Sequence, residues 1–158
     1  MDFQRAQQLT AKTFQDSIIP RLCEYIRIPN KSPAYDADWA KHGYMSDAVR
    51  LMEKWARERL SALPGATLEV VQLERRTPVI LIEVPGSNDD TILLYGHLDK
   101  QPEMSGWWEG FGPWTPVLKD GKLYGRGGAD DGYAMYGSLA ALLALKDQNV
   151  PHARCVIL

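Results

Sequence analysis

The stretch that decides the fold begins with TILLYGHLD at residues 91–99 and ends with ARCVIL at residues 153–158. Residues 91–95 and 153–158 are short apolar segments of the kind that form β-strands. Between them, residues 133–147 carry an apolar face at helical spacing. Strand, helix and strand in this order belong to the alternation that is typical of an α/β fold. Because residues 91–95 are apolar without alternation, we expect that strand to be buried on both faces.

The residues before this stretch continue the alternation of helices and strands. Apolar residues at helical spacing predict one helix over residues 3–28 and a second over 38–62. Pro20 should kink or split the first helix, because it lacks an N–H and crowds the preceding turn. Residues 66–73 and 78–84 are typical of strands. The sequence therefore predicts an α/β fold with a largely parallel sheet flanked by helices.

Composition limits the possible functions. The chain has 158 residues, 45% hydrophobic and 24% charged, which suits one globular domain or part of a larger one. Its net charge is −2 with both signs scattered, so we expect no nucleic-acid partner. The longest apolar run is too short to cross a bilayer, and we expect no membrane association. Cys23 and Cys155 lie far apart and favour buried free thiols, so we expect a cytoplasmic location.

One candidate site lies where the first strand of this stretch ends. His97 and Asp99 follow it, and positions two apart in an extended chain point to the same side. The carboxyl ends of strands are where α/β sheets bind ligands, and a carboxylate commonly fixes the tautomer of a metal-bound histidine. Taken alone, however, the pair is more typical of a surface-loop histidine beside an aspartate turn.

A second candidate site precedes the helix at residues 133–147. The sequence GRGGADDG at residues 125–132 brings the adjacent carboxylates of Asp130 and Asp131 to the start of that helix. Helix capping accounts for one aspartate, whereas the glycines indicate a close backbone approach. A phosphate cradle is disfavoured, because an acid stands where a dinucleotide-binding loop needs Gly or Ala. A cation suits the loop better than an anion.

Together, His97, Asp99 and Asp130 suggest a divalent metal site, with zinc favoured. The segments that surround them resemble the M20 zinc metallopeptidases, and the carnosinase-like dipeptidase and aminoacylase branch is the most similar. The resemblance is carried, in chain order, by YGHLDKQP at 95–102, WW at 107–108, PWTP at 113–116 and DGKLYGRGGADD at 120–131.

The resemblance implies a role for each of these residues. His97 corresponds to a ligand of the first metal, Asp130 to the carboxylate that bridges two zinc ions, and Asp99 to the catalytic carboxylate behind the histidine. It also implies a cis peptide bond between Asp130 and Asp131. One difference is that Gly132 and Tyr133 stand where the family usually has Lys-Gly.

The resemblance also implies parts that have no counterpart in residues 1–158: a general-base glutamate, further metal ligands and a lid and dimerisation domain. We therefore interpret residues 1–158 as the amino-terminal portion of one zinc-peptidase catalytic domain. For the whole protein we expect zinc-dependent hydrolysis of peptide or amide bonds in small peptides or N-acyl amino acids, and a homodimer. For this chain alone we expect little activity. The alternative is a non-catalytic protein that associates through exposed sheet edges.

Overall fold

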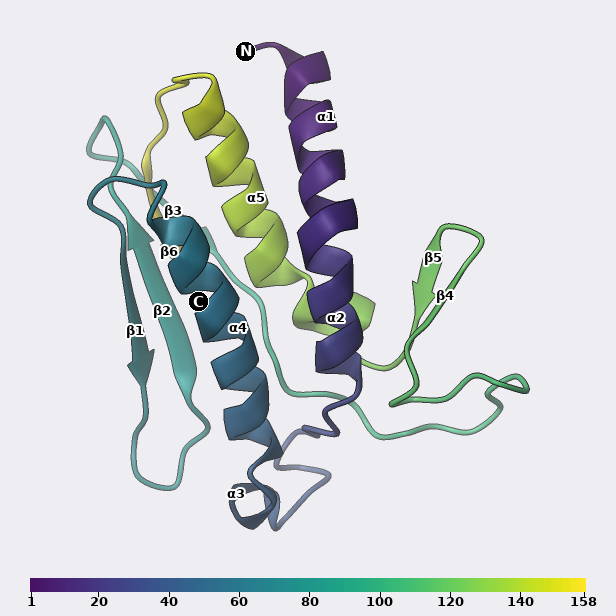
Figure 1. Ribbon diagram of the computed structural model, residues 1–158. Helices are drawn as coiled ribbons and strands as arrows, with labels where there is room; N and C mark the ends of the chain where they lie inside the picture. The colour runs from purple at the N-terminus through teal and green to yellow at the C-terminus, as the bar shows by residue number, and fades with distance from the viewer.

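The computed structural model describes residues 1–158 and confirms the α/β class, with helices packed against a sheet (Figure 1). The elements, in chain order, are α1 (Phe3–Thr13), η1 (Phe14–Ile18), α2 (Ile19–Ile26), α3 (Trp39–His42), α4 (Tyr44–Leu60), β1 (Thr67–Val71), β2 (Val79–Val84), β3 (Thr91–Leu94), β4 (Val117–Lys119), β5 (Lys122–Tyr124), η2 (Gly128–Gly132), α5 (Ala134–Asp147) and β6 (Arg154–Ile157).

The first helix is split near Pro20, as the sequence predicts. The wide turn η1 separates α1 from α2, and the N–H of Ile19 bonds to the carbonyl of Phe14, five residues back. Pro20 has no N–H to donate to the preceding turn, and a single wide turn is a common way to absorb such a defect. The two halves remain nearly collinear, so α1 reaches α5 (Figure 1).

The sheet has the order β1-β2-β6-β3, and its pairings are mixed. Strands β3 and β6 pair in parallel, with Ile92 opposite Cys155, and α5 lies in the connection between them. The prediction of a largely parallel sheet is wrong, because β1–β2 and β2–β6 are both antiparallel. The physical reason is the short connection between β1 and β2, which allows only a hairpin; a parallel pair needs a long crossover.

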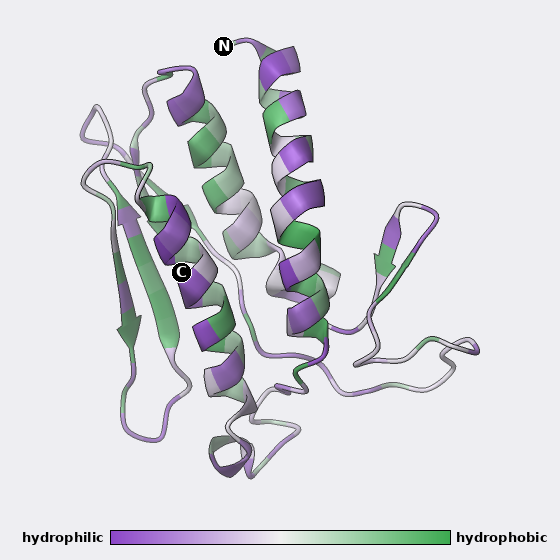
Figure 2. Cartoon of the chain, in the orientation of Figure 1, coloured by the Kyte–Doolittle hydropathy of each residue, from purple (hydrophilic) through white to green (hydrophobic).

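Strand β3 lies at the edge of the sheet, and the prediction that it is buried on both faces is also wrong. Ile92 is 48% exposed and Leu93 is 59% exposed. Buried side chains of the sheet, such as Ile82 and Cys155, belong to the cluster formed with α4 and α5, so helices cover one face. Figure 2 shows the hydrophobic residues along β2 and α5.

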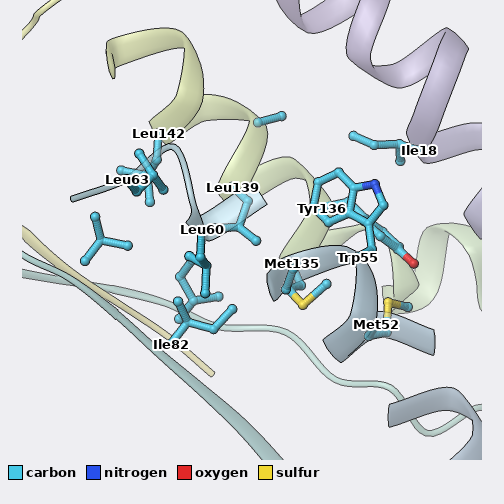
Figure 3. Packing of buried hydrophobic residues seen from close by; sticks show 14 of the residues in the cluster. Ile18, Met52, Trp55, Leu60, Leu63, Ile82, Met135, Tyr136, Leu139 and Leu142 are labelled. Carbon is cyan, nitrogen blue, oxygen red and sulfur yellow. The ribbon is translucent and has the colours of Figure 1, made fainter. Parts of the chain in front are cut away.

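The core holds α4 and α5 together and thereby fixes the start of α5. Trp55 of α4 and Tyr136 of α5 pack edge to face, with ring centroids 4.7 Å apart (Figure 3). The indole N–H of Trp55 donates to the hydroxyl of Ser17, 2.7 Å away, which links α4 to η1. Leu139 is fully buried in the same cluster. Because α5 is fixed in this way, the loop that precedes it is fixed as well.

The long segment after β3 contains a β-hairpin that the sequence analysis missed. Strands β4 and β5 pair antiparallel around Asp120 and Gly121, whose φ angles of 51° and 72° are both positive. Asp-Gly is a strong signal for a two-residue hairpin turn, so the hairpin could have been found. It projects from the helical core (Figure 1).

No helix in the structure combines the length and the hydropathy that a membrane crossing needs.

Candidate metal centre

The structure brings His97 and Asp99 together just beyond the carboxyl end of β3. The Nδ1 atom of His97 lies 3.1 Å from Oδ1 of Asp99 and 2.9 Å from the backbone oxygen of the same residue. An N–H on Nδ1 can donate to either oxygen. This hydrogen bond favours the tautomer in which the Nε2 lone pair is free to bind a cation.

Asp130 approaches the same imidazole from the loop before α5. Its Oδ1 atom lies 3.1 Å from Nε2 of His97. Asp130 has φ −128° and ψ 90°, so the segment labelled η2 is a kinked loop and not a regular helix at this point. No side chain caps α5, so capping is not what the aspartates do here. The peptide bond between Asp130 and Asp131 is cis, as the resemblance implies.

Two glycines allow this close approach. A Cβ atom on Gly96 would lie 2.4 Å from Cβ of Ala134, so the segment after β3 packs closely against the start of α5. A Cβ atom on Gly132 would lie 2.2 Å from the ring of Tyr25. Real Cβ contacts are not that short. Glycine at both positions is therefore a steric requirement of the site.

The spacing and chemistry of the two donors fit a shared zinc ion. Ligands of a tetrahedral zinc at roughly 2.0–2.2 Å are about 3.3–3.6 Å apart, and Nε2 of His97 is slightly closer to Oδ1 of Asp130, at 3.1 Å. No group of three or more His, Cys, Asp or Glu side chains in the chain could hold a metal ion. His97 and Asp130 therefore form half of a metal site at most. Their roles as ligands, and that of Asp99 in catalysis, stay predictions.

The electrostatics of His97 favour a positive charge at this point. Partial burial acts to lower the pKa of His97, but the hydrogen bonds and charges of Asp99 and Asp130 outweigh it and raise that pKa above its ordinary value. In the protonated form both ring N–H groups can donate to a carboxylate. A proton on Nε2 therefore occupies the position that a bound metal would take, and the two compete.

A cavity of about 340 Å³ adjoins the site. His97, Asp99 and Asp131 form part of its wall, and apolar side chains such as Ile80 and Met135 form much of the rest. The carboxylate of Asp131 points toward Gly96, where a Cβ atom would lie 3.0 Å from its Oδ2 atom. Cavities of this size hold small organic ligands, so a substrate group could lie next to the His97–Asp130 pair.

Lys100, which no sequence pattern marks as a site residue, lies directly after Asp99 and is 1% exposed. Burial lowers its pKa to about 7, while its ammonium group lies 2.7 Å from the backbone oxygen of Tyr25 and 2.6 Å from that of Ile28. These contacts join segments that are 72 and 75 residues apart. Local sequence carries no signal for such a contact.

The chain is similar to known hydrolases in sequence and in fold. Residues 93–158 match Peptidase family M20/M25/M40. A metallohydrolase of Methanocaldococcus jannaschii is 30% identical over 132 residues, which are 80% of this chain and 31% of the relative. Acetylornithine deacetylase of Proteus mirabilis is 33% identical over 132 residues, 82% of this chain and 32% of the relative.

The crystal structure of human carnosine dipeptidase 1 matches 98% of this chain and 33% of its own chain, with a TM-score of 0.63 and 26% identity. This chain therefore spans about a third of the length of the relatives that it matches.

Proposed function

Because the chain belongs to the M20 peptidase family, we propose that the whole protein hydrolyses peptide or amide bonds in small substrates with the help of bound zinc. The observation that carries the proposal is the approach of Nε2 of His97 to Oδ1 of Asp130 at 3.1 Å. His97 follows β3 and Asp130 lies in the loop before α5, and the two form an ion pair when His97 is protonated.

His97 and Asp130 are the residues that would hold zinc. When bound, zinc supplies a Lewis acid that polarises the carbonyl group of the substrate. Asp99 accepts a hydrogen bond from the Nδ1–H group of His97. This bond keeps Nε2 directed toward Asp130. That arrangement orients the histidine before metal arrives, so less ordering is needed when it binds.

Small peptides and N-acyl amino acids are the proposed substrates. The relatives include an acetylornithine deacetylase and a carnosine dipeptidase, both named for action on small amides. The cavity of about 340 Å³ beside His97 is large enough for one small substituent. A homodimer of the whole protein and a cytoplasmic location stay predictions.

Two histidine variants test the proposal in the whole protein, with dipeptides and N-acetyl amino acids as substrates. His97→Ala should abolish zinc-dependent hydrolysis, whereas His152→Ala, which changes a histidine outside the site, should retain it. Equal activity of the two variants would contradict the proposal.

In the 158-residue chain alone we expect weak zinc binding and little turnover, because only half of a site is present. Robust turnover with two bound zinc ions would show that the ligand account is wrong.

A second candidate function is supported by the exposed edge of the sheet. Strand β3 leaves one edge unpaired and exposes Leu93, and such edges can pair with another chain. On this reading the chain is a non-catalytic interaction protein. Sedimentation with and without a chelator separates the candidates. Discrete oligomers that do not depend on zinc and disappear in Leu93→Lys would favour the interaction protein.

A further inference from the structure

Lys100 is the most deeply buried charged side chain near the candidate metal centre, and its partners are backbone oxygens. Its Nζ atom lies 2.7 Å from the oxygen of Tyr25 and 2.6 Å from that of Ile28. Tyr25 lies in the last turn of α2 and Ile28 lies two residues beyond its end, where the helix dipole is negative and favours a cation. The ammonium group also lies 3.8 Å from the centroid of the Tyr25 ring. It therefore ties the end of α2 to the segment that carries His97.

The same two segments are joined at Leu98, between His97 and Asp99. The hydroxyl of Tyr25 and the side-chain amide of Asn30 both donate to the Leu98 oxygen, at 2.6 Å and 2.7 Å. Backbone hydrogen bonds continue the connection, since the N–H of Lys100 donates to the oxygen of Asn30 at 3.0 Å. We call Lys100, Tyr25 and Asn30 the anchor. All three are buried.

The loop that carries Asp130 packs on the same anchor from the other side. A Cβ atom on Gly127 would lie 2.5 Å from Cε of Lys100, and one on Gly132 would lie 2.2 Å from the Tyr25 ring. The N–H of Gly132 donates to the oxygen of Gly127 at 2.8 Å, so this loop closes around the buried side chains. The His97 segment and the Asp130 loop thus rest on one support.

We propose that Lys100, with Tyr25 and Asn30, is a positioning residue that sets the placement of His97 relative to Asp130. It does so through the Leu98 backbone and the Gly127–Gly132 loop, and it does not touch the metal or the substrate. The inference rests on the proposed function, because it gives a role to the His97–Asp130 pair. It goes beyond that function in assigning the geometry of the pair to a buried lysine outside it.

The test compares Lys100→Met with Lys54→Met, which alters an exposed lysine on α4. The 158-residue chain contains three histidines, so labelling their imidazoles with ¹⁵N gives His97 and two internal references. At fixed pH and with a chelator present, Lys100→Met should move the His97 signals toward those of free histidine. The signals of His42 and His152 should stay in place, and Lys54→Met should move none. A folded Lys100→Met chain with unchanged His97 signals would overturn the proposal.

Tyr25→Phe keeps the proposal testable if Lys100→Met does not fold. The phenyl ring still fills the space against Gly132, and Asn30 still donates to the Leu98 oxygen, so only one hydrogen bond of the anchor is lost. We expect a smaller shift of the His97 signals in the same direction. Unchanged signals in this variant would count against the proposal as well.

Titration with zinc chloride separates this inference from the proposed function. The folded Lys100→Met chain should bind zinc roughly 10- to 100-fold more weakly than the unaltered chain, as supporting residues around metal ligands commonly do when changed. Equal affinities would overturn the positioning role. If the unaltered chain binds no zinc but its His97 signals still depend on Lys100, the positioning role stands and the proposed metal site fails.

Discussion

At the scale of single residues, the imidazole of His97 is the centre of the account. One ring nitrogen is held by Asp99 and the other faces Asp130, so the ring has a fixed orientation without metal. Both carboxylates favour the imidazolium and raise the pKa of His97 above its ordinary value of 6.5. Protons and metal therefore compete for Nε2 at a higher pH than they would at an isolated histidine.

The first prediction concerns this titration in the metal-free chain. NMR of the imidazole should give a pKa above 6.5 for His97, and Asp130→Asn should lower it by removing a negative charge. Because the pKa is raised by folding, the contribution of His97 to stability is fully present below about 6.5 and is lost as pH rises through the folded-state value. A His97 pKa at or below 6.5 would contradict the observed contacts.

A second prediction concerns the contact between β3 and α5. Gly96→Ala would place a methyl group 2.4 Å from Cβ of Ala134 and should destabilise the chain by about 1–3 kcal/mol in urea unfolding. Gly137→Ala is the matched control, because nothing but a ring carbon of Tyr133 lies within 4 Å, at 3.8 Å. Alanine within α5 should raise stability by about 0.5–1 kcal/mol. Similar effects at the two positions would show that the contact is looser than described.

The sequence pointed to His97 and Asp130 as candidate site residues, but it did not point to the buried residues that hold them in place. His97, Asp99 and Asp130 stand in short motifs whose side chains suggest metal chemistry, and the structure brings them together. Lys100 and Tyr25 gave no such signal, because their contact joins positions 75 residues apart. A lysine after an apolar strand looks like an exposed residue until the end of α2 is placed against it.

At the scale of elements, the packing of α5 in the core holds the candidate metal centre in place. Leu139 lies on α5 and is fully buried among residues of α4 and the sheet. The Asp130 loop is the direct amino-terminal extension of α5. A change that loosens this helix should therefore also affect the loop.

The third prediction tests this packing. Leu139→Ala should lower the free energy of unfolding by about 2–5 kcal/mol, because it removes buried methyl groups and leaves a cavity. Leu118→Ala, on β4, should change it by less than about 0.5 kcal/mol, since Leu118 is 52% exposed. Urea denaturation of both variants provides the measurement. A small effect at Leu139 would mean that α5 is not part of the core.

Helices and strands were predictable from spacing, but strand partners were not. The apolar run at residues 91–95 gave β3 correctly and could not reveal that it lies at an edge. Burial on both faces depends on what covers the sheet, which local hydropathy does not encode. The mixed pairing of the sheet is also not encoded by local hydropathy. The connection through α5 makes β3 and β6 parallel, whereas β2 pairs with β6 although the two strands are far apart in the sequence.

At the scale of the whole molecule, the chain is an α/β unit that brings together two residues proposed as metal ligands, His97 and Asp130. Its anchor contacts Leu98, next to His97, and the loop with the cis peptide bond brings Asp130 against His97. Since the chain spans about a third of the relatives that it matches, the complete set of ligands belongs to the whole protein as a proposal.

The most direct measurement is diffraction at the zinc absorption edge from crystals of the chain grown with excess zinc. The account predicts an anomalous peak about 2.0–2.2 Å from both Nε2 of His97 and Oδ1 of Asp130. Zinc bound only elsewhere, or a map in which His97 and Asp130 turn away from each other with no peak between them, would contradict it.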